Sequence, residues 1–331
     1  MPPFPTVASV SSPARRRVAV IGAASSIGIR PYDDPREARH LDRAPDALRT
    51  LGLIERLGAD DLADVTSPPY RDFTRLPGRI RNEEDLVGYT HALADRVAQG
   101  TSDGRFALVL GGDCSIILAS LLGVARHTGP IGLAYIDGHA DFASPEESQT
   151  GSAASMCLGL AVGRGDSPLA RLAGEAPLVR GVDVVLIGRR DAGQPYGHDA
   201  LSASGILDIP GDALSEAGGD AVARLALERL GKAELRGFWI HVDADVLDPT
   251  VMAAVDSPEP GGPSISDLAA LLTPLVRHPC ALGMQLTIYD PALDIDRSCG
   301  KRLVALLEEV LAPETPESHD AVLDGRAGGR S

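Results

Sequence analysis

Short runs of apolar residues alternate with longer amphipathic segments from about residue 17 to residue 311. Apolar runs of four to eight residues bounded by Gly, Asp or Pro are typical of buried strands, whereas the longer segments have helical spacing. We predict strands at Arg17–Ala23, Phe106–Leu110, Ile131–Ile136, Val182–Ile187, Gly237–Val242 and Ala281–Tyr289. We predict helices at Glu83–Ala98, Ser115–Arg126, Asp220–Leu230, Ile265–Val276 and Lys301–Leu311. This alternation indicates a three-layer α/β/α fold with a mainly parallel sheet.

The two ends of the chain differ from this pattern. Residues 1–13 and 313–331 are rich in Pro, Ser, Gly and Ala, and we predict that both segments are disordered. Residues 14–312 are expected to form one domain, because 44% hydrophobic content is enough for a large core. With only 4% aromatic residues, that core must consist mainly of Leu, Val, Ile and Ala.

Two acidic clusters end predicted strands. The first is Asp137-Gly-His139-Ala-Asp141, and the second is Asp243-Ala-Asp245-Val-Leu-Asp248-Pro249. Residues i, i+2 and i+4 of a strand share a face, so we expect two converging sets whose carboxylates repel one another: Asp137, His139 and Asp141, and His241, Asp243 and Asp245. Divalent cations would relieve this repulsion, and oxygen ligands with one imidazole suit Mn²⁺. Each cluster alone fits a turn or capping role equally well, but two together favour a binuclear metal site.

These clusters also carry a resemblance to a known family. Together with Gly111-Gly112-Asp113-Cys114-Ser115, and in this order, they resemble the signature segments of the arginase, agmatinase and formiminoglutamase family. The resemblance extends from the strand at Val18–Ala23 to about Leu311. The acidic motifs are specific, whereas the Gly-Gly-Asp segment by itself is weak. The resemblance implies an arginase-like fold and a hydrolase with two divalent metal ions, usually Mn²⁺.

The resemblance also implies a set of metal ligands. The first ion would be held by Cys114, Asp137, Asp141 and Asp243, and the second by Asp137, His139, Asp243 and Asp245. The family has histidine where Cys114 stands, and a softer thiolate favours Zn²⁺, Fe²⁺ or Co²⁺ or weakens a Mn²⁺ site. Alternatively, Cys114 is a small buried residue that binds no metal. His241, on the same strand face as Asp243, could supply the missing imidazole or could be a packing residue.

Other departures from the family pattern concern the substrate. Ala154 stands at the position of a proton-shuttle histidine, and Ile288 stands where a guanidinium-binding glutamate is expected. Without that glutamate, a free guanidinium lacks its bidentate carboxylate partner, unless Asp290, Asp256 or Glu259 takes its place. Free arginine is therefore a doubtful substrate. An N-hydroxylated or acylated guanidine, or a guanidino group in a larger molecule, would need less assistance.

The sequence retains part of a substrate-binding set. Thr150 and Ser152 stand where arginases bind the amino-acid end of arginine, but Ala143 is a third such position without a polar group. Ser257 is a conservative match for a hydroxyl residue that lines the guanidinium pocket. The polar stretches Ser144–Ser155 and Asp256–Ser264 follow the two acidic clusters, and we expect them to form loops over the substrate.

The resemblance thus implies cleavage of a guanidino or amidino C–N bond, with release of urea or a substituted urea. In this mechanism Asp141 orients the attacking water and passes a proton to the leaving amine. One alternative is a single-metal amide hydrolase of the deacetylase type, although it does not explain five carboxylates in two motifs. Another is a catalytically degenerate homologue that only binds metal.

Charge and cysteine content limit the partners and the compartment. A formal charge of −15 argues against nucleic acid or an anionic membrane surface as a partner. The four cysteines show no C-x-x-C spacing and indicate reduced thiols, so we expect a cytoplasmic protein. Arg15-Arg16-Arg17 precedes an apolar run that is too short for an export signal. The resemblance implies a homo-oligomer, commonly a trimer or hexamer.

Overall fold

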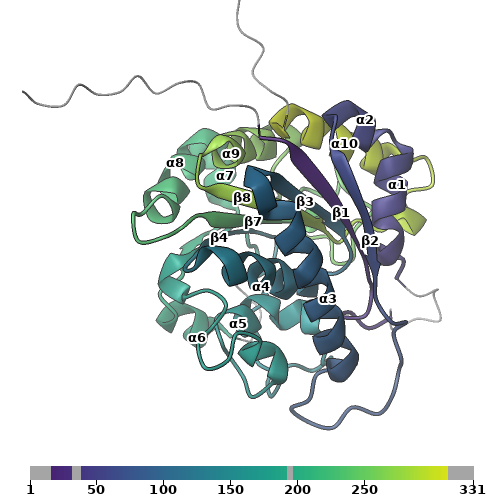
Figure 1. Cartoon of the computed structure of the whole chain (residues 1–331), viewed down its shortest axis with the longest axis vertical. Coiled ribbons are helices and arrows are strands. Elements are labelled where there is room, and N and C mark those ends of the chain that lie inside the picture. Colours follow the sequence, from purple (N-terminus) through teal and green to yellow (C-terminus); the bar gives the residue numbers. More distant parts are fainter. Residues whose placement is uncertain (1–15, 32–38, 192–196, 312–331) are drawn as a thin grey trace, which may run out of the picture.

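Eight parallel strands form a single sheet at the centre of the protein (Figure 1). The computed structural model describes residues 16–31, 39–191 and 197–311. The strand order is β2-β1-β3-β8-β7-β4-β5-β6, and every pair is parallel, which confirms the predicted parallel sheet. The strands are β1 (Val18–Ala24), β2 (Asp60–Thr66), β3 (Phe106–Gly111), β4 (Gly132–Ile136), β5 (Val184–Ile187), β6 (Leu207–Ile209), β7 (Phe238–Asp243) and β8 (Ala281–Thr287).

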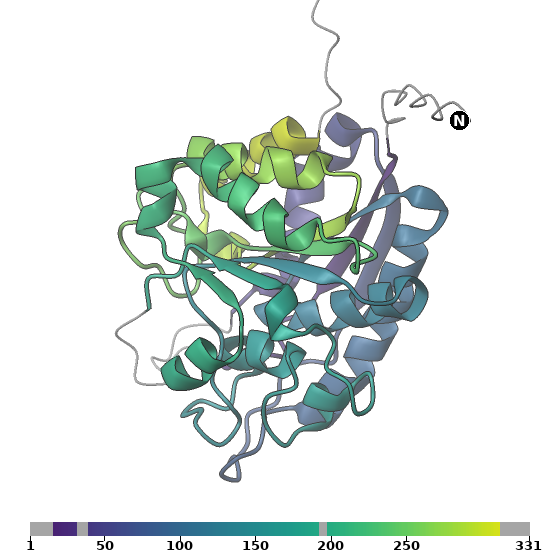
Figure 2. The same ribbon diagram turned by 90° about the vertical axis from the view of Figure 1, so that its left-hand side faces the viewer.

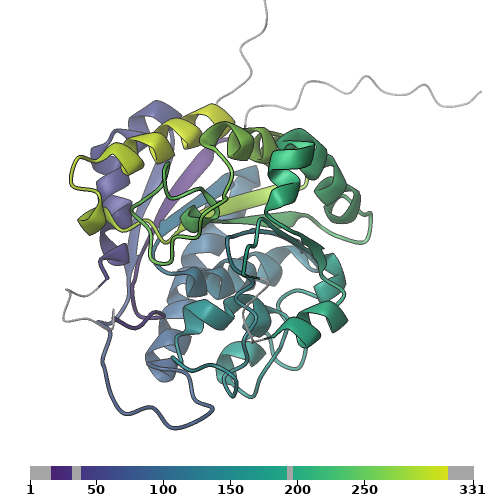
Figure 3. The same ribbon diagram turned by 180° about the vertical axis from the view of Figure 1, so that it is seen from behind.

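Helices cover both faces of the sheet, as the predicted three-layer fold requires (Figure 2). One layer contains α3 and α4, with α5 and α6 beside them, and the other contains α1, α2 and α7–α10 (Figures 1 and 3). The helices are α1 (Ala44–Thr50), α2 (Leu53–Leu57), α3 (Glu83–Thr101), α4 (Ile117–Thr128), α5 (Cys157–Ala161), α6 (His198–Ala203), α7 (Asp212–Ala217), α8 (Gly219–Leu230), α9 (Ile265–Arg277) and α10 (Ser298–Leu311). Within the described residues, no helix is long and apolar enough to cross a membrane.

All six predicted strands are present, but two further strands were missed. β2 has the sequence DDLADVT and lies at an edge of the sheet, where none of its residues is fully buried. An edge strand needs no continuous apolar run, so this segment gave no strand signal. β6 lies at the other edge and has only three residues. The segments predicted to be disordered, residues 1–13 and 313–331, lie outside the described residues.

The strand β8 ends earlier than predicted. It runs to Thr287 rather than Tyr289, because Ile288 has a φ of 67° and leaves the extended conformation. A β-branched residue rarely adopts this left-handed conformation. The backbone N–H of Ile288 donates to the carbonyl of Gly112, at the end of β3 (3.0 Å).

The register of three central strands sets up rows of polar side chains. Tyr135 of β4 lies opposite His241 of β7, which in turn lies opposite Gln285 of β8. Asp243 pairs with Thr287 in the same way, two residues closer to the carboxyl ends of the strands. Because the strands are parallel, the loops that follow β3, β4 and β7 open at the same edge of the sheet, where α/β proteins place their sites.

A glycine allows the largest side chain of this region to pack. Gly283 lies opposite Trp239, and a Cβ atom at Gly283 would be 2.4 Å from Cζ3 of the indole ring. We predict that Gly283→Ala lowers the free energy of unfolding by about 1–3 kcal/mol, because the fully buried Trp239 cannot move aside. Urea denaturation would measure this change.

Gly88→Ala is the matched control. Gly88 lies within α3 and has no atom within 4 Å of its ideal Cβ position. The same substitution there should stabilise the protein by about 0.5–1 kcal/mol, since alanine is the better helix former. Equal stability of the Gly283→Ala variant and the unmodified protein would contradict the proposed packing constraint.

Candidate metal centre

The turn after β3 fixes the position of Cys114. The Asp113 side chain accepts hydrogen bonds from the backbone N–H groups of Ser115 (3.0 Å) and Gly28 (2.9 Å). This cap starts the short 3₁₀ turn Cys114–Ile116, which leads into α4. The Cys114 thiol is buried and donates to Oδ2 of Asp243 (2.6 Å).

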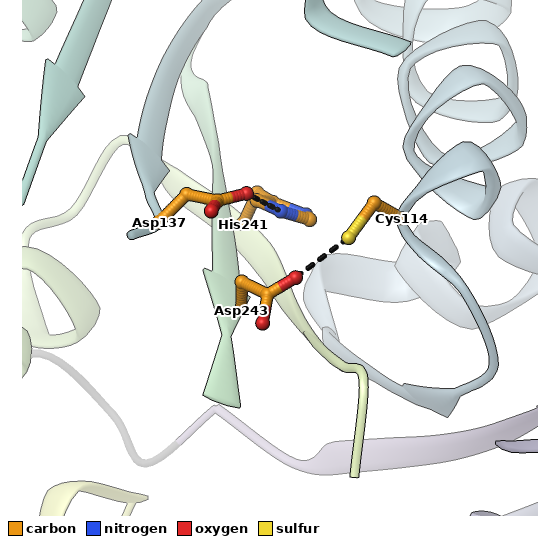
Figure 4. A group of neighbouring side chains, drawn as sticks. All are labelled: Cys114, Asp137, His241 and Asp243. Carbon is orange, nitrogen blue, oxygen red and sulfur yellow. Dashed lines mark hydrogen bonds and ion pairs between the residues drawn. The ribbon is translucent and has the colours of Figure 1, made fainter. Parts of the chain in front are cut away.

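Two groups of side chains that could hold metal ions converge at the carboxyl ends of β4 and β7. In each group, one potential ligand atom from every member lies within 4.8 Å of the others. The first group consists of Cys114, Asp137, His241 and Asp243 (Figure 4). The second consists of Asp137, His139 and Asp245. Asp137 belongs to both groups, as expected of a carboxylate that bridges two ions.

Backbone hydrogen bonds orient these carboxylates. Oδ1 of Asp137 accepts from the N–H of His139 (2.7 Å), and Oδ1 of Asp243 accepts from the N–H of Asp245 (2.8 Å). Oδ1 of Asp245 accepts from the N–H of Gly138 (3.2 Å), and its Oδ2 lies 3.1 Å from Nδ1 of His139. The backbone therefore holds one oxygen of each aspartate, so the other oxygen remains for a ligand.

The electrostatics of the two groups favour bound cations. Burial raises the pKa of Asp243 well above its ordinary value, and nearby Asp245 and Asp137 raise it further. Burial also raises the pKa of the Cys114 thiol, with Asp243 contributing. Although burial opposes it, the neighbouring imidazoles of His139 and His241 hold the pKa of Asp137 below its usual range. The two ligand groups thus bring three buried carboxylates together with two imidazoles, an arrangement that favours bound cations.

Two buried atoms test directly whether a metal fits. Among the described residues, Oδ2 of Asp137 and Nε2 of His241 have no hydrogen-bond partner, and they lie 3.6 Å apart. Buried polar atoms almost always have a partner, so the contacts of these two atoms are not complete in this structure. Carboxylate, imidazole and thiol donors together suit divalent transition metals. The site therefore fits metal ions.

A cleft of about 380 Å³ opens above the two groups. The predicted substrate residues Thr150, Ser152 and Ser257 line it, together with parts of both predicted loops. The Ser152 hydroxyl accepts from the N–H of Arg30 (3.1 Å), and the Ser257 hydroxyl donates to Asp256 (2.9 Å). The Thr150 hydroxyl accepts from the N–H of Ser152 (3.2 Å). All three hydroxyls already have a partner within the protein.

Comparison with known proteins agrees with this arrangement. The sequence model of the Arginase family matches residues 16–312. The chain belongs to the arginase family. It is 30% identical over 294 residues to the arginase of Bacillus subtilis, covering 87% of this chain and 97% of that protein. The arginase of Bacillus caldovelox is also 30% identical, over 86% of this chain and 96% of its own. The crystal structure of that arginase superposes with a TM-score of 0.79 and 26% identity, over 90% of this chain and 99% of the other.

Asp141 lies outside both ligand groups, although the family resemblance implies that it binds the first ion. Asp141 lines the cleft but belongs to neither ligand group, and its φ is 46°. The Tyr135 hydroxyl donates to its Oδ2 (2.7 Å). Withdrawal from water, together with the charge of Asp137, raises the pKa of Asp141 well above its ordinary value. Whether Asp141 ligates a metal stays a prediction.

The two unusual residues of this family member both face the cleft. Ala154 and Ile288 line it, and so does Cys114. That Ala154 and Ile288 stand at the positions of the family's histidine and glutamate stays a prediction.

Asp248 lies apart from the two ligand groups. Its Oδ1 accepts from the N–H of Thr250 (2.9 Å) and its Oδ2 from the N–H of Gly261 (2.9 Å). It caps the turn after β7, and neither ligand group includes it. Asp248 thus has the turn role that an Asp-Pro pair commonly has.

Three further residues support the site, and sequence reasoning missed two of them, Tyr135 and Gln285. Tyr135 binds Asp141, and Gln285 contacts Nδ1 of His241 (2.8 Å). Arg190 donates to the carbonyls of Asp245 (2.9 Å) and Val246 (2.9 Å), and so fixes the segment after β7. Extending the two-residue alternation backwards from Asp137 finds Tyr135, whereas Gln285 gave no comparable signal.

We predict that divalent metal stabilises the metal-free protein. At a free metal concentration 100 times the Kd, each site should add about 2.7 kcal/mol, because the ion neutralises the buried carboxylates. Thermal denaturation after chelation, and again after Mn²⁺ addition, would show a rise in Tm of several degrees. The Asp243→Asn variant should lose much of this rise.

Glu216→Gln serves as the control, because Glu216 is exposed on α7 and belongs to neither ligand group. It should retain the full metal-dependent rise in Tm. The same rise in the Asp243→Asn variant would show that the ions bind elsewhere.

Proposed function

We propose that this arginase-family protein is a metal-dependent hydrolase that cleaves the C–N bond of a guanidino or amidino group, with release of urea or a substituted urea. The convergence of two ligand groups on Asp137, at the base of a cleft, carries the proposal. Membership in the arginase family supports it, since the named relatives are arginases. A single-metal amide hydrolase would not need a shared carboxylate between two groups.

The proposed cofactor is a pair of divalent ions. Mn²⁺ is expected from the family, and Zn²⁺, Fe²⁺ or Co²⁺ from the thiol of Cys114. When bound, the two ions would supply an activated water for attack on the guanidino carbon. The proposed ligands are, for the first ion, Cys114, Asp137, Asp141 and Asp243, and for the second ion, Asp137, His139, Asp243 and Asp245.

Asp141 has the proposed catalytic role. The Tyr135 hydroxyl donates to Oδ2 of Asp141, so Oδ1 is left to act in the cleft. Asp141 accepts a proton from the attacking water and passes it to the leaving nitrogen as the C–N bond breaks. The water thus contributes its oxygen to the urea product, the amine leaves with the proton, and Asp141 returns to the carboxylate.

We propose that the substrate is a guanidine other than free arginine. Ile288 is apolar and cannot form the bidentate pair that holds a guanidinium. Ala154 offers no proton-transfer group on its side of the cleft. A guanidine with a better leaving group, for example an N-hydroxylated or acylated guanidine, depends less on both missing groups. A cleft of about 380 Å³ can also accept a larger guanidino compound.

The cellular setting is proposed on physical grounds. The four cysteines are free thiols, which suits a reducing cytoplasm. The net charge of −15 disfavours nucleic acid and anionic membranes as partners. From the family we propose a homo-oligomer, a trimer or a hexamer.

A urea-release screen would test the proposed function. The protein would be loaded with Mn²⁺, Co²⁺ or Zn²⁺ and offered arginine, agmatine, N-hydroxyarginine, acylated guanidines and formimino compounds, with acetylated amines as the second substrate class. We expect turnover of at least one guanidine at more than ten times the rate with arginine. Faster turnover of an acetylated amine would support the deacetylase alternative. Metal-loaded protein that is inert toward the whole panel would support the degenerate homologue.

Ile288→Glu should raise kcat/KM for arginine at least about tenfold, because a carboxylate can pair with the guanidinium inside the cleft. Glutamate has no branch at Cβ, so it also fits the positive φ at this position better than isoleucine. The control is Ile288→Gln, which has the same shape without the charge. An equal effect of both variants would show that relief of backbone strain, and not the charge pair, is responsible.

A further inference from the structure

A row of polar side chains lies beneath the metal centre, inside the sheet. It consists of Tyr135 on β4, Trp239 and His241 on β7, and Gln285 on β8, and none of these residues has measurable exposure to solvent. Alternation along β7 places Trp239 and His241 on the same face as Asp243. The proposed reaction uses only Tyr135 from this row, so the role of the other three needs a separate explanation.

Trp239, at one end of this row, determines which group donates and which accepts in each hydrogen bond. The indole N–H of Trp239 can only donate, and it lies 3.1 Å from Oε1 of Gln285. The amide NH₂ of Gln285 therefore faces Nδ1 of His241, at 2.8 Å. Because an amide NH₂ can only donate, Nδ1 must accept and carries no proton.

The proton of the imidazole must then reside on Nε2. Nε2 faces Oδ2 of Asp137 at 3.6 Å, and neither atom has another partner among the described residues. Closing this gap by roughly 0.6 Å makes a normal N–H···O hydrogen bond. We propose that Trp239 and Gln285 hold His241 as the Nε2–H tautomer, so that His241 donates a hydrogen bond to Asp137 and is a positioning residue, not a metal ligand.

This inference rests on the proposed metal centre, in which Asp137 bridges the two ions. A donor on Oδ2 would fix the rotation of this carboxylate, as partners of ligating carboxylates commonly do. Stacking supports the arrangement, because the Tyr135 ring lies 4.1 Å from the His241 ring with an interplanar angle of 17°. Stacking on Tyr135 thus fixes the plane of the imidazole ring, and the contacts with Gln285 and Asp137 fix its rotation within that plane.

The competing assignment makes Nε2 of His241 a ligand in place of the family histidine, and its distance from Cys114 and Asp243 permits this. Ligation would move the proton to Nδ1, where it would face the NH₂ of Gln285. Turning the Gln285 amide over would instead direct its NH₂ toward the indole N–H of Trp239. Either arrangement leaves a buried donor without an acceptor, which costs about 1–3 kcal/mol. The tautomer that donates to Asp137 avoids this cost.

The consequence concerns the first metal. If His241 is a hydrogen-bond donor, the Cys114 thiol would be the only ligand of the first ion that is not a carboxylate oxygen. Such a site favours softer ions than an imidazole site with the same carboxylates would. Gln285 would then influence metal preference indirectly. It contacts His241, and His241 in turn contacts the proposed ligand Asp137.

Histidine-selective ¹H–¹⁵N correlation NMR would report the tautomer directly. The signals of His241, one of eight histidines, would be identified by their absence in His241→Gln. We expect a protonated Nε2 and an unprotonated Nδ1 in the metal-free protein, and the same pattern after Zn²⁺ is added. A proton on Nδ1, or a loss of the Nε2 proton on metal addition, would overturn the inference.

Metal titration of variants provides an independent readout. His241→Phe retains a ring that can stack on Tyr135 but loses the donor, so we expect two ions per chain with affinity lowered about 10- to 100-fold. Loss of one ion per chain would instead identify His241 as a ligand. If the metal-free protein shows the expected tautomer but binds no divalent ion, the proposed metal centre fails, and the positioning role fails with it.

Gln285→Glu should reverse the tautomer. A carboxylate can accept from both Trp239 and a protonated Nδ1, which would free Nε2 to bind metal. We expect the NMR signal of the proton to move to Nδ1, and Co²⁺ binding at the Cys114 site to become about tenfold tighter. Gln285→Leu, which offers no acceptor, should not produce this tightening. An unchanged Nε2–H signal in Gln285→Glu would show that Gln285 does not set the tautomer.

Discussion

The burial of like charges at the carboxyl ends of β4 and β7 is the constraint on which the rest of this structure depends. Asp137, Asp243 and Asp245 are almost completely buried within one small region, which they share with the imidazoles of His139 and His241. An unpaired buried carboxylate is costly, and its cost rises with each like charge nearby. The fold tolerates three of them because backbone N–H groups bind one oxygen of each. The remaining oxygens converge, which is the arrangement expected of ligands to divalent cations.

The sheet and the loops contribute differently to this site. Strand register determines where the carboxylates lie, since Asp137 continues β4 and Asp243 ends β7 on neighbouring parallel strands. The loops after the strands form the walls of the cleft, and these carry the residues that depart from the family pattern, Ala154 and Ile288. Loops can change without loss of the sheet. Residues of the cleft walls can therefore differ between family members while the sheet that places the carboxylates stays the same.

How much could be predicted from the sequence depended on whether a residue lies within a regular strand. For the central strands, apolar runs and two-residue alternation were enough to bring Asp137 and Asp243 together, and the motifs identified the family. The alternation does not extend to Asp248, since the backbone turns after Asp245 and directs that carboxylate to backbone N–H groups. It also gave no signal for β2, whose burial is limited by its edge position. Sequence patterns did not indicate a role for Gln285, because its partners Trp239 and His241 lie on another strand and only the strand register brings them together.

The backbone strain at Ile288 links two of the departures from the family pattern. A β-branched residue at a φ of 67° costs on the order of 1–3 kcal/mol, so other contacts must hold it there. Its N–H donates to the carbonyl of Gly112, two residues before Cys114. The segment that places the thiol against Asp243 therefore also directs Ile288 into the cleft. A change in the conformation of this turn would move a proposed metal ligand and the wall of the substrate cleft together, which makes the two positions one structural unit.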